Sequence, residues 1–528
     1  MTSLTMPRRI AVGALCAGVG LAACSQPPGA GSAAGEGERA PVACDSLADL
    51  ALPGAKVTLA QRVAPGAFKA PPPPPGPPVE VDYGALPAFC RVAATAAPTP
   101  DSVIKFEVWL PVEGWNGKLV TVGNGGFSGA IWYFEMARPL MRGYAVAGSD
   151  TGHEGGPADI SFAVGHPEKL VDFAWRAVHE TTVKGKAIVA ANYAKPASRS
   201  YWVGCSTGGR QGLKAAQRFP DDFDGIAAGA PANNWVPLMA YGAQVQRVLT
   251  DPAVGLAPPQ LAMLKEAAIA ACDARDDVTD RVVEDPRSCT FDPGTLACTA
   301  GKSSGCLTPR QVEAARSLYG GVVSPRTKEK ILPGPAPGGE LQWQAYAPGV
   351  FPIADNYWRD YVMADPAWTV AKLDVDADVA RGKTVDTAEV AATDPNLKPF
   401  VASGGKLLLW HGWTDGLIPA QNTIDYYESA LAATGADQSK DSVRLFMVPG
   451  VDHCSGGEGT FVVDALGVID TWVESGKPPE RIVARRPLDG GAVRTRPLCP
   501  YPQVARYRGQ GSTDDASNFA CMPEPTRR

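Results

Sequence analysis

The residues that could do chemistry begin with a serine between two glycines, in the stretch Gly204-Cys205-Ser206-Thr207-Gly208. A β-prone apolar run precedes this stretch and a helical pattern follows it, which is the arrangement of a nucleophile elbow. The sharp turn from strand to helix exposes the serine hydroxyl, and the glycines let neighbouring backbone approach without a Cβ clash. A glycine-rich connection without catalytic function is the alternative, but the strand and the helix favour a nucleophile.

A nucleophilic serine needs a base, and the chain has only five histidines. Three of them precede Ser206, whereas the order in α/β-hydrolases is serine, then acid, then histidine. His411 and His453 remain. We predict that His453 is the base and Asp415 the acid that orients it, with His411 a structural histidine at a strand end. Asp452 is the weaker candidate acid, because it adjoins His453 and adjacent side chains rarely face each other.

A glycine cluster that ends in Gly125-Gly126 follows a predicted strand at residues 118–122. Glycines at the carboxyl end of a buried strand can leave backbone N–H groups pointing into a cleft, where they stabilise an oxyanion. We predict this role for the N–H groups of Gly126 and Thr207, with Gly125 as the alternative to Gly126. A bare glycine-rich turn is the other interpretation.

The elements that must position these residues alternate between strands and helices. Residues 104–110, 118–122 and 143–150 predict strands, and residues 170–193 predict a helix that leads to the elbow strand. This alternation indicates a mostly parallel sheet covered on both faces, and the elbow makes an α/β-hydrolase fold the predicted class.

At 528 residues and 45% hydrophobic, the chain is long enough for more than one domain. We predict a hydrolase core in two parts, residues 80–232 and 400–528, separated by a lid at residues 233–399. An insertion at that point lies over the serine and shapes the acyl pocket. The aromatic candidates for that pocket are Trp343, Tyr357, Trp358 and Tyr361, although core packing is the more common role of such residues.

The N-terminal residues predict export. Residues 1–23 have the charged start and apolar run of a signal peptide, and Leu21-Ala22-Ala23-Cys24 resembles a bacterial lipobox that would leave Cys24 lipid-modified. A plain secretory signal is the alternative. Residues 24–79 predict a flexible spacer and a proline-rich arm. No later stretch has the ~20 apolar residues of a membrane span, so a lipid anchor would be the membrane contact.

Cysteine spacing agrees with an exported chain. Ten cysteines remain besides Cys16 and Cys24, which predicts five disulfides. Cys205 adjoins Ser206 and Cys454 adjoins His453, so a nucleophile and base in contact would bring these two cysteines within bonding reach. Proximity in the sequence favours the pairs Cys44–Cys90, Cys272–Cys289, Cys298–Cys306 and Cys499–Cys521. Other connectivities, and unpaired thiols at 205 and 454, remain open.

Several blocks resemble one family. They are residues 204–212 with 218–226 just after, His411-Gly412-Trp413-Thr414-Asp415, residues 448–457, and the tail 494–502. From about residue 80 to Cys521 the chain resembles the tannase and feruloyl esterase family, and its tail is similar to members that hydrolyse mono(hydroxyethyl) terephthalate. The resemblance implies an α/β-hydrolase core with a lid, a Ser-Asp-His triad beside a disulfide clamp, and a small aromatic ester as substrate.

The resemblance also implies a structural calcium ion in the lid. Its ligands would be the carboxylates of Asp273, Asp276 and Asp280 with the backbone carbonyls of Val278 and Val282. Carboxylate oxygens suit this hard cation, although the spacing is not that of an EF-hand. Asp277 and Arg281 stand where the family usually has glycine, and a solvated acidic turn is the alternative.

The predicted activity is hydrolysis of hydroxycinnamoyl or galloyl esters by a serine carboxylesterase, in the periplasm or outside the cell. Terephthalate monoester hydrolysis is the alternative activity, but neither Arg359 nor Arg381 matches the family arginine that would bind the free carboxylate. A non-catalytic binding protein on the same scaffold is the second class of hypothesis. The net charge of -6 without basic blocks argues against nucleic acid as a partner.

Overall fold

A nine-stranded sheet lies at the centre of the computed structural model, which describes residues 41–72, 81–301 and 304–523. The predicted signal peptide, Cys24 and most of the proline run lie outside these residues. The strand order is β1-β2-β3-β5-β4-β6-β7-β10-β11. The strands are β1 (Ala55–Val63), β2 (Phe89–Ala96), β3 (Ile104–Pro111), β4 (Lys118–Val122), β5 (Ala145–Ser149), β6 (Arg199–Cys205), β7 (Gly225–Gly229), β10 (Lys406–Gly412) and β11 (Val443–Val448).

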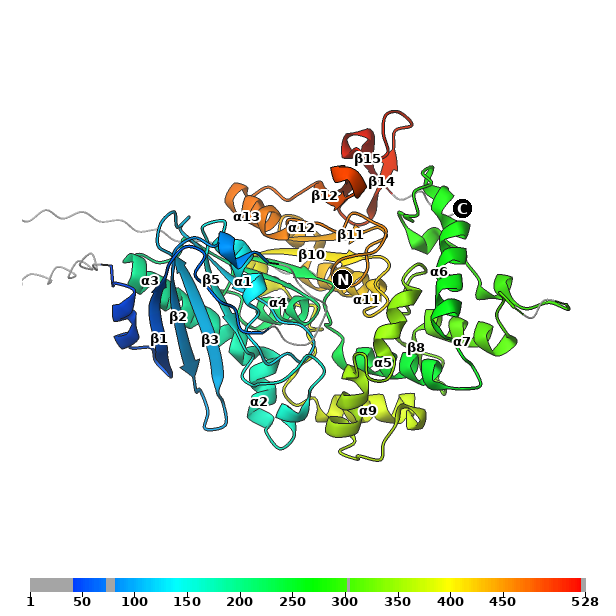
Figure 1. Ribbon diagram of the computed structural model, residues 1–528, viewed down its shortest axis with the longest axis horizontal. Coiled ribbons are helices and arrows are strands. Elements are labelled where there is room, and N and C mark those ends of the chain that lie inside the picture. Colours follow the sequence, from blue (N-terminus) through cyan, green and yellow to red (C-terminus); the bar gives the residue numbers. More distant parts are fainter. Residues whose placement is uncertain (1–40, 73–80, 302–303, 524–528) are drawn as a thin grey trace, which may run out of the picture. The chain divides into compact units, whose positions relative to one another are not determined.

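The sheet is antiparallel at one edge and parallel over the rest. Strands β1, β2, β3 and β5 pair antiparallel in that order, and every pair from β5 through β4, β6, β7 and β10 to β11 is parallel. Figure 1 shows β1–β3 in blue at the antiparallel edge. Strands β5 and β7 are buried along their whole length, as parallel strands covered on both faces must be. The predicted sheet is therefore confirmed.

Helices cover both faces of the sheet. Helices α1 and α13 contribute to the apolar cluster on one face, and α3, α4 and α11 pack on the other. The predicted helix at 170–193 begins earlier, at Pro167, and runs through a π-helical turn at Asp172–Arg176 to Tyr193. The core helices are α1 (Tyr133–Leu140), α2 (Pro167–Val171), α3 (Ala177–Tyr193), α4 (Thr207–Arg218), α10 (Lys398–Ala402), α11 (Ala420–Thr434), α12 (Ala436–Ser439) and α13 (Ala465–Ser475).

Residues 233–399, called the lid segment below, leave the sheet after β7 and return before β10, although these two strands are neighbours. In Figure 1 the segment lies beside the sheet, in green and yellow-green. It contains α5 (Trp235–Thr250), α6 (Pro258–Cys272), α7 (Pro309–Gly320), α8 (Ile353–Asn356), α9 (Val375–Val385) and the hairpin of β8 (Val322–Val323) and β9 (Lys330–Leu332).

The lid segment has an apolar core of its own. That core continues into the hydrolase part through Phe127 and Phe173. Trp343, Tyr357 and Trp358 are buried in it, and Tyr361 is half-buried against it.

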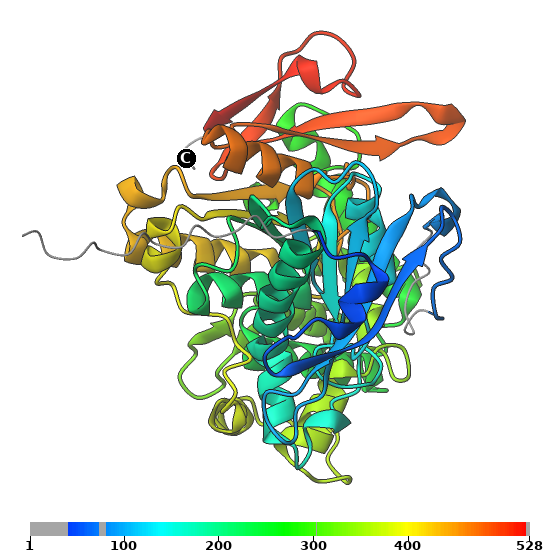
Figure 2. The ribbon, with the colours of Figure 1, turned by 90° about the vertical axis from the view of Figure 1, so that its left-hand side faces the viewer.

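The C-terminal part forms two hairpins, β12 (Ile482–Pro487) with β13 (Val493–Leu498) and β14 (Gln503–Tyr507) with β15 (Phe519–Pro523). Figure 2 shows them side by side, in orange and red. No helix within the described ranges combines the length and apolar character that crossing a membrane requires.

Candidate active site

The predicted nucleophile lies on a sharp turn between β6 and α4. Ser206 has φ 63° and ψ −122°, a conformation that costs a non-glycine residue of order 1–3 kcal/mol and that surrounding contacts must hold. Its N–H donates to the carbonyl of Gly229, 3.0 Å away on the next strand. A Cβ on Gly204 would lie 2.7 Å from the backbone of Gly208, so only glycine permits this crossing. The local geometry is that of a nucleophile elbow.

Asp415 and His453 meet across the ends of two neighbouring strands. Asp415 follows β10 and His453 follows β11, and because these strands are parallel their carboxyl ends lie at one edge of the sheet. The Nδ1 atom of His453 is 2.7 Å from Oδ2 of Asp415. The Asp415 side chain is fully buried, whereas 18% of the His453 side chain is exposed. The other ring nitrogen, Nε2, lies 3.8 Å from Sγ of Cys454, and His453 lines the same cleft as Ser206.

A second histidine also contacts the predicted acid, which the sequence patterns did not indicate. His411 Nε2 lies 3.1 Å from Oδ2 of Asp415 and 3.0 Å from the carbonyl oxygen of Ile418. Both neighbours are acceptors, so Nε2 carries the proton and Nδ1 accepts from the Thr423 hydroxyl at 2.8 Å. His411 is a buried histidine at a strand end, as predicted, but one bonded to Asp415. The spacing of four residues between His411 and Asp415 is the feature of the sequence that could have predicted this contact.

The protonation state of Asp415 follows from these contacts. Burial raises the pKa of its carboxyl, but the charge and hydrogen bonds of His453 and the hydrogen bond of His411 outweigh burial and hold the pKa well below its usual range. Oδ1 also accepts from the backbone N–H groups of Leu417 and Ile418, at 2.9 and 2.8 Å. Asp415 is therefore a carboxylate. Asp452, the weaker candidate, instead accepts from the Thr414 hydroxyl.

The five predicted cysteine pairs are each bonded in the structure: Cys44–Cys90, Cys205–Cys454, Cys272–Cys289, Cys298–Cys306 and Cys499–Cys521. The second pair joins the residue before Ser206 to the residue after His453, with Cα atoms 6.0 Å apart. It fixes the elbow to the histidine loop over a sequence separation of 249 residues. Five disulfides are typical of an exported protein.

The predicted oxyanion loop lies next to the elbow. The Thr207 hydroxyl donates to the carbonyl of Gly126 at 2.9 Å. Gly126 has φ 54°, and a Cβ there would lie 2.2 Å from the carbonyl oxygen of Pro157. Within the described ranges, the N–H groups of Gly125, Gly126 and Thr207 have no acceptor, whereas that of Phe127 donates to Pro157. Both the predicted donors and the alternative Gly125 thus remain available.

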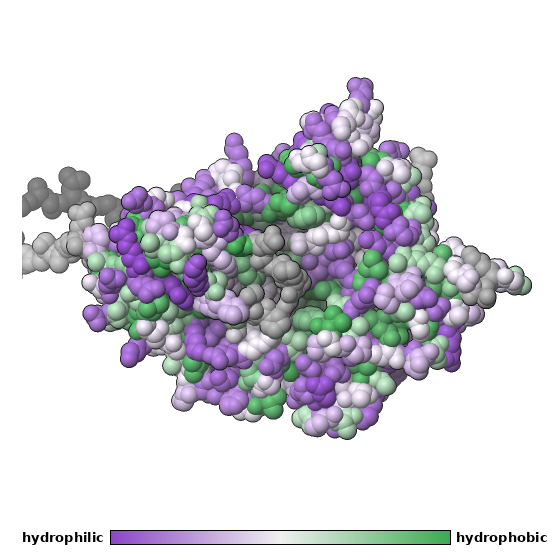
Figure 3. All heavy atoms as spheres, viewed as in Figure 1, coloured by the Kyte–Doolittle hydropathy of each residue, from purple (hydrophilic) through white to green (hydrophobic). Residues whose placement is uncertain are grey.

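Ser206 and His453 line one cleft between the hydrolase core and the lid segment. Figure 3 shows the hollowed face, with hydrophobic residues beside the hollow. The four aromatic lid residues named from the sequence do not line this cleft. The large apolar side chains that do, near the elbow and the lid, include Trp132, Leu238, Met239, Tyr346, Phe351 and Ile418. Trp132 packs on the oxyanion loop, because a Cβ on Gly125 would lie 2.3 Å from its ring.

The acidic loop of the lid segment holds its carboxylates through local hydrogen bonds. Asp276 accepts from the backbone N–H groups of Val278 and Glu284, and burial together with the nearby Asp280 and Asp273 raises its pKa to about 6. Asp280 forms an ion pair with Arg496. In the part of the chain that the structure describes, no group of three His, Cys, Asp or Glu side chains is arranged around a metal position. Carboxylate oxygens are the ligand type that a hard cation prefers, but in this structure Asp280 is paired with Arg494 and Arg496.

The sheet and the site together define a class of protein. A serine on an elbow after one parallel strand, an acid after a later strand and a histidine after the last are the parts of an α/β-hydrolase, in the order that this fold uses. The prediction of the fold class is thus confirmed.

Comparison with known proteins is consistent with this class. A family model described as tannase and feruloyl esterase matches residues 90–522. The mono(2-hydroxyethyl) terephthalate hydrolase of Piscinibacter sakaiensis is 33% identical, covering 85% of this chain and 87% of its own. A probable feruloyl esterase B-2 of Aspergillus terreus is 32% identical, covering 82% and 86%. The crystal structure of feruloyl esterase B from Aspergillus oryzae has a TM-score of 0.83 at 30% identity, covering 91% and 99%. The chain belongs to the tannase and feruloyl esterase family and is an ester hydrolase.

Proposed function

We propose that the protein hydrolyses carboxylic esters with an aromatic acyl group, using Ser206 as nucleophile, His453 as base and Asp415 as the orienting acid. The observation that carries this proposal is the 2.7 Å contact between His453 and Asp415 in a cleft that also contains the elbow serine. The Cys205–Cys454 disulfide supports this proposal, because it keeps His453 beside Ser206.

Acylation uses the groups in a fixed order. His453 Nε2 takes the proton of the Ser206 hydroxyl as the oxygen attacks the ester carbonyl, and Asp415 stabilises the imidazolium through Nδ1. The N–H groups of Gly126 and Thr207 donate to the oxyanion of the tetrahedral intermediate. When that intermediate collapses, His453 gives its proton to the leaving alcohol and the acyl group stays on Ser206.

Deacylation repeats these steps with water. His453 removes a proton from a water molecule, the resulting hydroxide attacks the acyl carbonyl, and the same two N–H groups hold the second oxyanion. Collapse of this intermediate returns the proton to Ser206 and releases the carboxylic acid.

The apolar part of the cleft suits an aromatic acyl group. Trp132, Leu238 and Met239 offer flat or apolar surface to a phenyl ring. Neither Arg359 nor Arg381 lines the cleft. Arg359 is held by its neighbours, with its Nε 2.7 Å from Asp360 and its Nη2 2.7 Å from Asn356. We therefore rank feruloyl and galloyl esters as more suitable substrates than the terephthalate monoester. The monoester is the second candidate because of the similarity to the hydrolase from Piscinibacter sakaiensis.

Initial rates on methyl ferulate, methyl gallate and mono(2-hydroxyethyl) terephthalate test this ranking, with Ser206→Ala as the control. We expect turnover of the first two to exceed turnover of the third, and no turnover by the variant. Faster hydrolysis of the terephthalate monoester would reverse the ranking. If a fluorophosphonate probe labelled neither the wild type nor the Ser206→Ala variant, the chain would be a binding protein on a hydrolase scaffold.

For the acidic loop, we propose a structural calcium ion held by Asp273, Asp276 and Asp280 with the carbonyls of Val278 and Val282. Bound calcium would neutralise the clustered carboxylates and stabilise the loop. At a concentration 100-fold above Kd, such binding adds about 2.7 kcal/mol to the free energy of unfolding. Calcium, but not magnesium, should restore a melting temperature lowered by EDTA. An unchanged melting temperature in EDTA would refute the site.

For the N-terminus, we propose a signal peptide ending before Cys24 and a lipid anchor on that residue, so that the enzyme acts outside the cytoplasm. The lipobox-like stretch supports this proposal. Metabolic labelling with a fatty acid in a bacterial host should mark the wild type but not Cys24→Ser. Equal labelling would argue for another anchor, and no labelling for a plain secretory signal.

A further inference from the structure

One lid side chain is bonded to both loops that carry the predicted acid and base. Gln342, in the 3-10 helix Glu340–Tyr346, donates from Nε2 to the carbonyl oxygen of Thr414 at 2.6 Å. Its Oε1 accepts from the backbone N–H of His453 at 3.0 Å. The first contact is to the residue before Asp415 and the second to the base itself.

These two contacts fix the orientation of the amide. A backbone carbonyl can only accept and a backbone N–H can only donate, so the amide of Gln342 fits these partners in one of its two orientations. A close backbone approach supports this placement, since a Cβ on Gly339 would lie 2.0 Å from the carbonyl oxygen of Thr414. The 3-10 helix Glu340–Tyr346 of the lid segment and the loop that carries Asp415 are therefore in direct contact at Gln342.

Two further lid side chains bind the next carbonyls of the same loop. The Tyr241 hydroxyl donates to the carbonyl oxygen of Gly416 at 3.1 Å, and the Tyr346 hydroxyl donates to that of Leu417 at 3.1 Å. Together with Gln342, the lid segment thus satisfies three carbonyls around Asp415.

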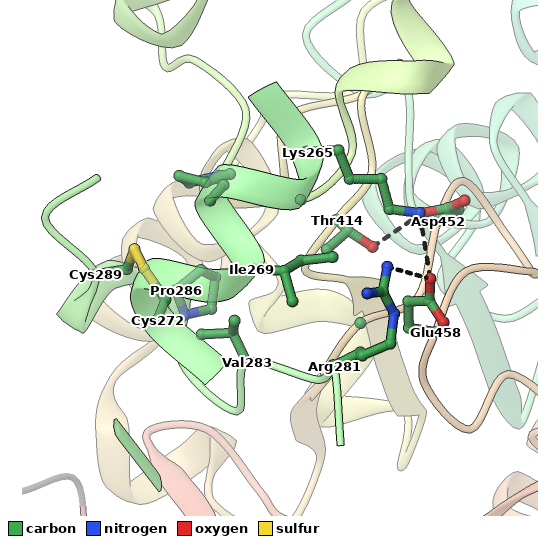
Figure 4. Close-up of a pocket in the computed structure, with 14 residues that line it drawn as sticks. Lys265, Ile269, Cys272, Arg281, Val283, Pro286, Cys289, Thr414, Asp452 and Glu458 are labelled. Carbon is green, nitrogen blue, oxygen red and sulfur yellow. Dashed lines mark hydrogen bonds and ion pairs between the residues drawn. A yellow bond between two sulfur atoms is a disulfide. The ribbon is translucent and has the colours of Figure 1, made fainter. Parts of the chain in front are cut away.

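The lid also contacts the histidine loop from a second side. Figure 4 shows Lys265 and Arg281, both from the lid segment, reaching Glu458, which follows His453 by five residues. The nitrogen–oxygen distances are 3.5 and 3.3 Å. In the same view the Thr414 hydroxyl points at Asp452, with Oγ1 and Oδ1 2.9 Å apart.

We infer that Gln342 is a positioning residue for the ester hydrolysis proposed above. Its amide sets the separation of the Asp415 and His453 loops, so the lid segment aligns the catalytic groups besides covering the substrate. Proton transfer through His453 requires its ring to stay within about 0.5 Å of the productive position. If the lid segment moved away as a rigid body, both hydrogen bonds of Gln342 would break and the two catalytic loops would lose this alignment. We therefore expect these hydrogen bonds to persist during turnover.

Kinetics of three variants test this role. Gln342→Met keeps the length of the side chain but loses both hydrogen bonds, and Gln342→Asn keeps the amide but is too short to reach both loops. The matched control is Gln344→Met, two residues along the same helix, whose side chain has no hydrogen bond among the described residues. We expect both changes at 342 to lower kcat about 10- to 100-fold on methyl ferulate, because small misplacements of catalytic groups cost about this much. KM should change less than about twofold, since Gln342 does not line the substrate cleft.

The control should match the wild type in kcat, and circular dichroism should show that all three variants are folded. A kcat within twofold of wild type in either variant at 342 would overturn the inference. So would a loss confined to KM, or an equal loss in Gln344→Met. Ser206→Ala separates this inference from the proposed function, because a variant at 206 that stayed active would refute the triad itself.

Discussion

Removal of the disulfide beside the catalytic groups should lower both the stability of the protein and its activity. The change is the double substitution Cys205→Ser with Cys454→Ser. Chain-entropy arguments for a sequence separation of 249 residues give a loss of about 5 kcal/mol in the free energy of unfolding. For a unit of about 490 residues, with an unfolding entropy near 1 kcal/mol/K, this corresponds to a fall of about 5 °C in Tm.

The effect on catalysis comes from alignment. The disulfide holds the residue before Ser206 and the residue after His453 at a Cα separation of 6.0 Å. Without it, a shift of about 1 Å between hydroxyl and imidazole should lower kcat roughly 100-fold. Steady-state kinetics on methyl ferulate and calorimetry of the same preparation measure the two effects.

A second disulfide provides the control. Cys298 and Cys306 close a lid loop with a separation of only 8 residues, so Cys298→Ser with Cys306→Ser should cost about 2–3 kcal/mol and leave kcat unchanged. If the 205/454 variant kept kcat within twofold of wild type, the disulfide would not align the triad. Equal losses of kcat in both double variants would point to a general loss of folded protein.

Three further changes have defined outcomes. Asp415→Asn should lower kcat about 10⁴-fold, because an amide nitrogen facing Nδ1 of His453 would force the wrong tautomer; a loss below tenfold would contradict the assigned acid. His411→Leu removes one of four donors to Asp415 and should lower kcat about tenfold, whereas an unchanged kcat would make the contact incidental. Burial raises the pKa of Asp150 to about 7, so its folded form keeps a proton that the unfolded chain loses near pH 4, and stability falls between those values as pH rises. The free energy of unfolding of Asp150→Asn should therefore rise relative to that of wild type by about 2–3 kcal/mol from pH 5 to pH 8. A difference that stayed constant with pH would contradict the shifted pKa.

The sequence by itself determined the parts of the site whose geometry is local. The glycines around Ser206 let the strand and the helix of the elbow pass close to each other, and the chain order of serine, acid and histidine reduced five histidines to two. Cysteines next to Ser206 and His453 then indicated which distant segments meet. These features are visible in a sequence because each depends on residues adjacent in the chain.

Tertiary structure decided the contacts between segments far apart in the chain. Gln342 reaches the Asp415 loop only because the lid segment and the strand ends pack together, and periodicity along one segment carries no information on such partners. The same packing buries Trp343 and Trp358 in the lid core and leaves Trp132, which no sequence pattern singled out, on the cleft. A side chain's neighbours across an interface depend on the shape of both surfaces, and that shape exists only in the folded chain.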